Sequence, residues 1–213
     1  MLVDPSVAAV CAASGPQAEP SNEEVASSFL ESISHEEGFV WSYLRVGQLA
    51  VLLGDTLFVH GGLPFDALGW VPPVAMRYAT PSEGAACGGT CLPEGHSAQA
   101  WVEALNRAYE ENLRDFRAQM TWRSDGSRGG ETLLCLTSTP ACFSRSIVVE
   151  SRLQEGMPTR EDPRVSQYLA ARGVRRVVCG HKPCGDSPFV VQDGGVEMVH
   201  GDTTFSDTGA ADS

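Results

Sequence analysis

The amino-acid sequence predicts a protein of the α/β class, and three segments in its C-terminal third carry this prediction. Residues 145–151 and 174–181 have the apolar, β-branched composition of strands, and residues 162–173 have the periodicity of a helix. The helix has a proline in its first turn and a glycine at its C-terminal end. Strand, helix and strand in this order favour an α/β architecture, in which ligands bind at strand ends.

The N-terminal part of the chain is predicted to begin with a disordered leader, residues 1–20. The leader is rich in alanine but lacks the basic region that opens a secretory signal. Beyond it, the spacing of Val25, Phe29 and Ile33 predicts a short amphipathic helix that starts at residue 22. The apolar segment 39–44 is expected to follow and to pack inward.

A β-hairpin is predicted next along the chain. Residues 49–53 form one strand, Gly54 and Asp55 form the turn, and residues 56–60 form the return strand. We therefore interpret Asp55 as a turn residue rather than as a metal ligand. Residues 64–95 contain many prolines and glycines, which indicates an irregular loop.

The strongest helical pattern lies in residues 97–120, and Ser97 is the predicted N-cap. Charged residues lie on the other faces of this helix. A glycine-rich break follows at 124–131, and residues 132–138 could form a strand or a short helix. The predicted inward face of the long helix consists of Trp101, Leu105, Ala108, Asn112, Phe116 and Met120.

Composition excludes several functions for this chain of 213 residues. A formal net charge of −12 argues against a broad surface for nucleic acids or anionic membranes, and an anionic substrate would need a local positive centre. No apolar stretch approaches the roughly 20 residues that cross a bilayer. The seven cysteines are odd in number and irregularly spaced, which favours a reduced protein of the cytoplasm.

Two histidines stand at the ends of predicted strands, each beside glycine. His60 ends a strand in the sequence FVHGGLP, and His181 ends another in VVCGHKPCGDSP. A neutral imidazole binds a divalent transition metal through one nitrogen, and a glycine lets the backbone turn beside the ligand. One such histidine is commonly a hydrogen-bonded structural residue, but two at equivalent strand ends predict ligands that the fold brings together.

The motifs FVHGGL, VVCGHKPxGDSP and HGDTTFSD resemble the C-terminal half of the calcineurin-like metallophosphoesterase superfamily, which includes the serine/threonine phosphoprotein phosphatases. The similarity extends from about residue 38 to residue 207, so we expect residues 22–207 to be the C-terminal part of such a domain and 208–213 to be a tail. The resemblance implies an α/β fold, a partial β-sandwich flanked by helices.

The same resemblance implies a metal-dependent phosphoesterase with two divalent ions of the Mn, Fe or Zn class. Its substrate would be a phosphorylated protein or a small phosphate ester. His60 and His181 match the two histidines that coordinate one of the metals in this superfamily. In such enzymes the two metals bridge a phosphate and activate a hydroxide for attack.

The N-terminal motifs of the superfamily, GDxHG, GDxxDRG and GNHE, do not occur in this chain. These motifs supply the remaining metal ligands and the catalytic acid, so the catalytic residues stay unassigned. We therefore expect an incomplete fragment of the catalytic domain. The alternatives are a non-catalytic binding or scaffold protein derived from a phosphatase fold, and a chain that is not stably folded alone.

Four further residues are candidates for positions near the metals or the substrate. His200 ends the last predicted strand, residues 196–200, and Asp202 lies two residues after it; both are expected to support the metal ligands or to have a structural role. Lys182 and Arg145 could meet a substrate phosphate. The residues Cys87, Cys91 and His96 resemble a zinc cluster, but the spacing differs from CxxC and no fourth ligand is evident nearby.

Overall fold

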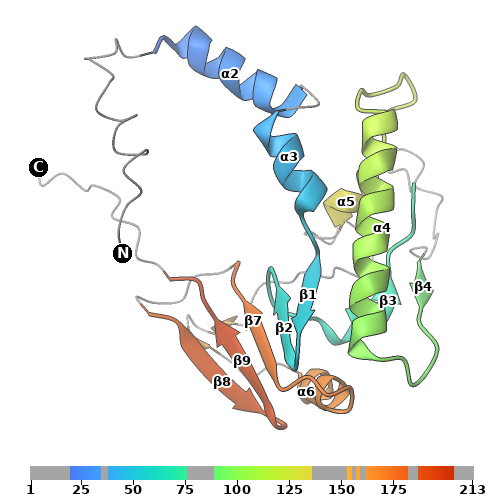
Figure 1. Cartoon of the computed structure of the whole chain (residues 1–213), viewed down its shortest axis with the longest axis vertical. Helices are drawn as coiled ribbons and strands as arrows, with labels where there is room; N and C mark the ends of the chain where they lie inside the picture. Colours follow the sequence, from blue (N-terminus) through green and yellow to red (C-terminus); the bar gives the residue numbers. More distant parts are fainter. Residues whose placement is uncertain are drawn as a thin grey trace, which may run out of the picture. The chain divides into compact units, whose positions relative to one another are not determined.

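The computed structural model describes residues 20–34, 38–75, 89–135, 153–154, 157–158, 162–181 and 187–203 (Figure 1). The predicted leader up to residue 19, the predicted strand 145–151 and the tail 208–213 lie outside these residues. The chain divides into two compact units, Met1–Gly47 and Gln48–Ser213. The boundary falls inside the predicted domain 22–207.

The described residues of the first unit contain two helices, α2 (Asn22–Ser34) and α3 (Phe39–Val46). Trp41 is the buried residue of α3, and its indole N–H donates to the carbonyl of Ile33 at 2.8 Å. The predicted apolar stripe of α2 is exposed: Val25 and Phe29 keep 54% and 63% of their accessible surface. The helix predicted to start at residue 22 is therefore confirmed as α2, with Val25 and Phe29 exposed in the described part of the chain.

The second unit is built on a five-stranded sheet with the order β1-β2-β7-β9-β8. Its strands are β1 (Ala50–Leu53), β2 (Thr56–Val59), β7 (Arg176–Cys179), β8 (Phe189–Asp193) and β9 (Val196–His200). The predicted hairpin is confirmed as β1 and β2, which pair antiparallel around Gly54 and Asp55. Strands β2, β7 and β9 run parallel to one another, so their carboxyl ends meet at one edge of the sheet.

The core of the second unit lies on one face of this sheet. Leu57 of β2, Val177 of β7 and Met198 of β9 stand opposite one another in register, and all three are buried. Helices α4 (Ala98–Ala118) and α6 (Pro163–Ala170) contribute to the same apolar cluster. The helical side chains in that cluster are Ala98, Trp101, Val102, Leu105, Val165 and Leu169.

The helices predicted at residues 97–120 and 162–173 are confirmed as α4 and α6, and side-chain caps explain where they begin. Ser97 accepts a hydrogen bond from the amide of Ala100, and Asp162 accepts one from the amide of Arg164. The buried face of α4 includes Trp101, Leu105, Ala108 and Asn112, as predicted. Met120 lies beyond the end of α4 and is exposed, so the predicted face is too long by that residue.

The segment after Pro64 is more regular than its composition predicts. It contains the short 3-10 helix η1 (Phe65–Ala67) and the antiparallel pair β3 (Trp70–Val71) and β4 (Thr90–Cys91). Helix α5 (Glu131–Cys135) shows that the start of the ambiguous segment 132–138 is helical. Strands β5 (Leu153–Gln154) and β6 (Met157–Pro158) form a separate pair.

The mixed helix and sheet content confirms the α/β class. The described elements form one large sheet and two two-stranded pairs, so the second sheet of a sandwich is not among them. Within the described residues, no helix is both long and apolar enough to span a membrane.

Candidate functional site

Three polar side chains follow the carboxyl ends of the three parallel strands. His60 comes directly after β2, His181 comes two residues after β7, and Asp202 comes two residues after β9. The backbone ladder continues past the strands, because the amide of Gly180 donates to the carbonyl of His60 at 2.9 Å. The amide of Gly201 likewise donates to the carbonyl of Cys179 at 2.8 Å. The chain ends of the three strands are therefore held side by side.

The imidazoles of His60 and His181 are in direct contact. Nε2 of His60 lies 2.9 Å from Nδ1 of His181, although 121 residues separate them in the sequence. The ring centroids are 4.7 Å apart and the rings are tilted by 59°. Both side chains are exposed to solvent. The predicted convergence of these two histidines is present in the structure.

The distance between the two nitrogens is compatible with two kinds of interaction. It is the length of a hydrogen bond, in which one ring donates its N–H to the lone pair of the other. It is also close to the separation of two ligands on one ion: at bonds of about 2.1 Å, two nitrogens are about 3.0 Å apart at a right angle and about 3.4 Å apart at the tetrahedral angle. A metal ion would take the place of the shared proton.

Local backbone geometry places His181 beside His60. His181 has a φ of +78°, in the left-handed region that residues other than glycine rarely adopt. Gly180 before it has no room for a side chain, because a Cβ there would lie 2.6 Å from Oδ1 of Asp202. The carboxylate of Asp202 therefore packs against the backbone that carries His181. No sequence motif singled out this contact, but the matching order Gly180-His181 and Gly201-Asp202 on neighbouring strands indicates it.

His200 has a structural environment on the buried face of the sheet. Its Nδ1 lies 3.5 Å from Sγ of Cys179, and its ring stacks on Phe189 with centroids 4.4 Å apart. Register explains both contacts, because Cys179 and Phe189 are the pairing partners of His200 in β7 and β8. Burial lowers the pKa of His200, since desolvation disfavours the charged imidazolium.

The donors for a complete metal site are not found in the described part of the chain. Among these residues, no group of three or more His, Cys, Asp and Glu side chains is arranged to hold a metal. Two of the predicted candidates, Lys182 and Arg145, lie outside the described residues. His60 and His181 thus fit as two ligands of one ion, while the residues described here do not supply the ligand sets of two ions.

The residues Cys87, Cys91 and His96 resemble a zinc cluster in sequence, but in the structure His96 has two hydrogen-bond partners within the protein. His96 Nδ1 lies 2.8 Å from the carbonyl of Pro93, and its Nε2 contacts the hydroxyl of Tyr168. Both ring nitrogens are thus engaged within the protein. Cys91 is exposed, and Cys87 lies outside the described residues. His96 therefore ties the loop before α4 to α6.

Comparisons with protein-family models, with curated proteins and with solved structures found no match for this chain.

Proposed function

We propose that this chain contributes a pair of histidine ligands to the divalent metal centre of a phosphoesterase. The contact between His60 and His181 at the carboxyl ends of parallel strands is the observation that supports this most. The resemblance of FVHGGL and VVCGHKP to the calcineurin-like superfamily supplies the reaction class. The substrate would be a phosphorylated protein or a small phosphate ester.

The residues of this chain would have two roles in such a centre. His60 and His181 would hold one ion through Nε2 and Nδ1, and Asp202 would stabilise the backbone around His181 by packing against Gly180. A bound divalent ion supplies a Lewis acid and a water molecule of lowered pKa. It would also supply the local positive charge that a phosphate needs near a chain of net charge −12.

A non-catalytic binding or scaffold protein derived from a phosphatase fold is the second candidate function. It is favoured by the finding that the described residues contain no group of three metal donors. The two functions share the histidine pair and differ in whether a bound ion turns over a phosphate ester. Activity therefore separates them, and metal binding alone does not.

Titration calorimetry of the purified chain with Mn²⁺ and Zn²⁺ tests the histidine pair. We expect His60→Ala and His181→Ala each to weaken binding by a factor of roughly 10 or more, because each removes one of two nitrogen donors. His96→Ala is the matched control and should bind as the wild type does, since its nitrogens contact Pro93 and Tyr168.

Hydrolysis of an aryl phosphate by the metal-loaded chain distinguishes the two functions. Hydrolysis by the wild type that is lost in His60→Ala and in His181→Ala supports the phosphoesterase. Metal binding without turnover supports the scaffold. Equal metal affinity in the wild type and both histidine variants contradicts the proposal that these residues are ligands.

A further inference from the structure

The second face of the five-stranded sheet carries a continuous row of apolar side chains. Successive residues of a strand point to opposite faces, so the neighbours of the buried Leu57, Val177 and Met198 lie on the face opposite the core, here called the outer face. One register row of the outer face crosses all five strands and is apolar throughout. This outer row consists of Val51, Phe58, Val178, Val199 and Val190.

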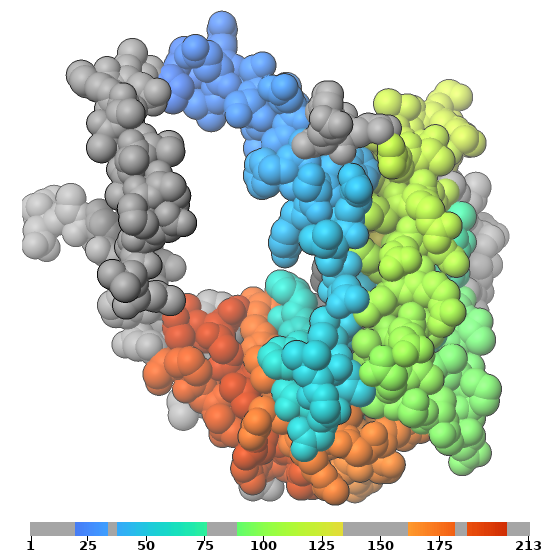
Figure 2. All heavy atoms as spheres, in the orientation of Figure 1, coloured from blue at the N-terminus to red at the C-terminus, as the bar shows by residue number. Residues whose placement is uncertain are grey.

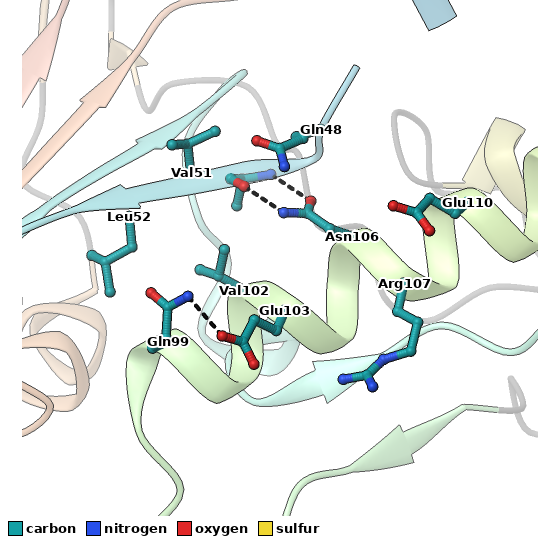
Figure 3. A pocket seen from close by; sticks show the side chains of 10 residues that line it. Gln48, Val51, Leu52, Gln99, Val102, Glu103, Asn106, Arg107 and Glu110 are labelled. Carbon is teal, nitrogen blue, oxygen red and sulfur yellow. Dashed lines mark hydrogen bonds between the residues drawn. The ribbon is translucent and has the colours of Figure 1, made fainter. Parts of the chain in front are cut away.

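The outer row is accessible in the described part of the chain. Phe58 and Val190 keep 38% and 56% of their accessible surface, and none of the five side chains is part of the buried core cluster. Val51 points away from α4, whereas Leu52 beside it points toward this helix (Figure 3). Atoms of β2, β7 and β9 lie next to one another at the surface of the second unit (Figure 2). With strands about 4.8 Å apart, the row is about 19 Å long, and a contiguous apolar patch of this kind is typical of an interaction surface.

The next register row contains the charged side chains of the outer face. Nη2 of Arg176 in β7 lies 2.6 Å from Oε2 of Glu197 in β9. The other members of this row, Leu53, Thr56 and Gln192, are uncharged. The described strand residues of the outer face therefore carry one positive and one negative charge, which cancel. The repulsion that a net charge of −12 produces is consequently not concentrated on this face.

We propose that two copies of this chain associate through their outer faces. Two sheets that pack face to face keep their strand directions within about 30° of each other, at a distance of about 10 Å. A two-fold axis nearly parallel to the strands, between β7 and β9, places the outer row of one copy on the outer row of the other. β7 then lies opposite the partner's β9, and β2 lies opposite the partner's β8. Val178 faces the partner's Val199, and Phe58 faces the partner's Val190.

The charged pair favours a second copy over a different protein as the partner. The same axis passes between Arg176 and Glu197, so each of them faces the opposite charge of the other copy. The apolar side chains beside the axis likewise face apolar ones. A two-fold interface must match its own surface in this way, and the outer face does so about the line between β7 and β9. The interface uses neither His60 nor His181, so this inference is independent of the proposed metal centre.

Sedimentation equilibrium of the full chain over a range of concentrations tests the association. We expect a reversible monomer–dimer equilibrium in the wild type. Val190→Lys should raise the dissociation constant by a factor of roughly 10 or more, because it places a charge against an apolar side chain of the partner. Val74→Lys is the matched control and should dimerise as the wild type does, since it makes the same change at an exposed valine outside the sheet. A monomeric wild type, or equal weakening by the two variants, would overturn the proposal.

Exchanging the two charges tests the symmetry of the interface. Arg176→Glu alone places carboxylates opposite one another, and Glu197→Arg alone places guanidinium groups opposite one another, so each variant should dimerise more weakly than the wild type. In a mixture of the two variants every pair across the interface has opposite signs, and heterodimers should form with nearly the wild-type affinity. The ion pair within each chain stays broken in the mixture, so a purely structural effect would not be rescued. A mixture as dissociated as the separate variants would overturn the proposed pairing.

Discussion

His181 combines an unfavourable backbone conformation with the contact on which the candidate site depends. Its φ of +78° costs on the order of 1–3 kcal/mol for a residue other than glycine. The hydrogen bond from Gly180 to His60 and the packing of Asp202 against Gly180 hold the backbone in place. Strain of this kind concentrates at functional positions, and here it orients Nδ1 of His181 toward His60.

The lowered pKa of His200 predicts that the protein loses stability in mild acid. His200 is neutral in the folded state over a range in which it takes up a proton in the unfolded state. The unfolded state therefore binds more protons below its histidine pKa of about 6.5, and the free energy of unfolding falls as the pH decreases through that value. This residue contributes a slope of up to about 1.4 kcal/mol per pH unit. Urea unfolding at a series of pH values measures it.

His200→Gln is the control for this effect, because glutamine does not titrate. The variant loses the stack on Phe189 and should be less stable at every pH. Its unfolding free energy should nevertheless depend less steeply on pH below about 6.5 than that of the wild type. Parallel pH profiles for the two proteins would show that His200 is not the titrating group.

At the scale of elements, the sequence predicted those helices and strands that have strong local signals. The hairpin of β1 and β2 was predictable from its Gly-Asp turn, and α4 from its apolar periodicity and the Ser97 cap. Strand β8 was missed, although FVVQD and VEMVH flank the Gly194-Gly195 pair that is typical of a hairpin turn. The short β3 and β4 were missed because pairs of two residues have no periodicity and depend on tertiary contacts.

Asn106 links α4 to the edge of β1, and its removal should destabilise the fold. Its amide makes three hydrogen bonds to Leu49 and Ala50. Asn106→Leu has a similar size but leaves these backbone groups unpaired, at an expected cost of about 1–3 kcal/mol in the free energy of unfolding. Asn106→Asp keeps the acceptor and loses the donor, so its loss should be smaller. Urea unfolding measures both, and a stability equal to that of the wild type in Asn106→Leu would contradict this role.

At the scale of the whole molecule, topology made part of the candidate site predictable. His60 and His181 each follow an apolar strand, and parallel strands bring their carboxyl ends together, so their convergence could be expected from the sequence. The position of Asp202 depends on the pairing of β9 with β7, which the sequence pattern does not specify. The contact of α4 with β1 through Asn106 was not predictable, because it depends on how the helix docks beside the sheet.

The excess negative charge predicts that salt stabilises this protein. A formal net charge of −12 repels itself more strongly in the compact state than in the unfolded chain. Raising the ionic strength from about 0.01 to about 0.1 M shortens the Debye length from about 30 to about 10 Å and weakens this repulsion. A gain of about 1 kcal/mol would raise the Tm by about 2–4 °C for a chain of this size.

Thermal unfolding followed by circular dichroism in NaCl and in KCl measures this effect. Screening is insensitive to the choice of monovalent cation, so the two salts should raise the Tm equally. The variant Glu94→Lys has a formal charge of −10, because one negative charge is removed and one positive charge is added to −12. It should therefore respond less to salt than the wild type does. A Tm that falls with salt would show that attractive ion pairs such as Arg176–Glu197 outweigh the net repulsion.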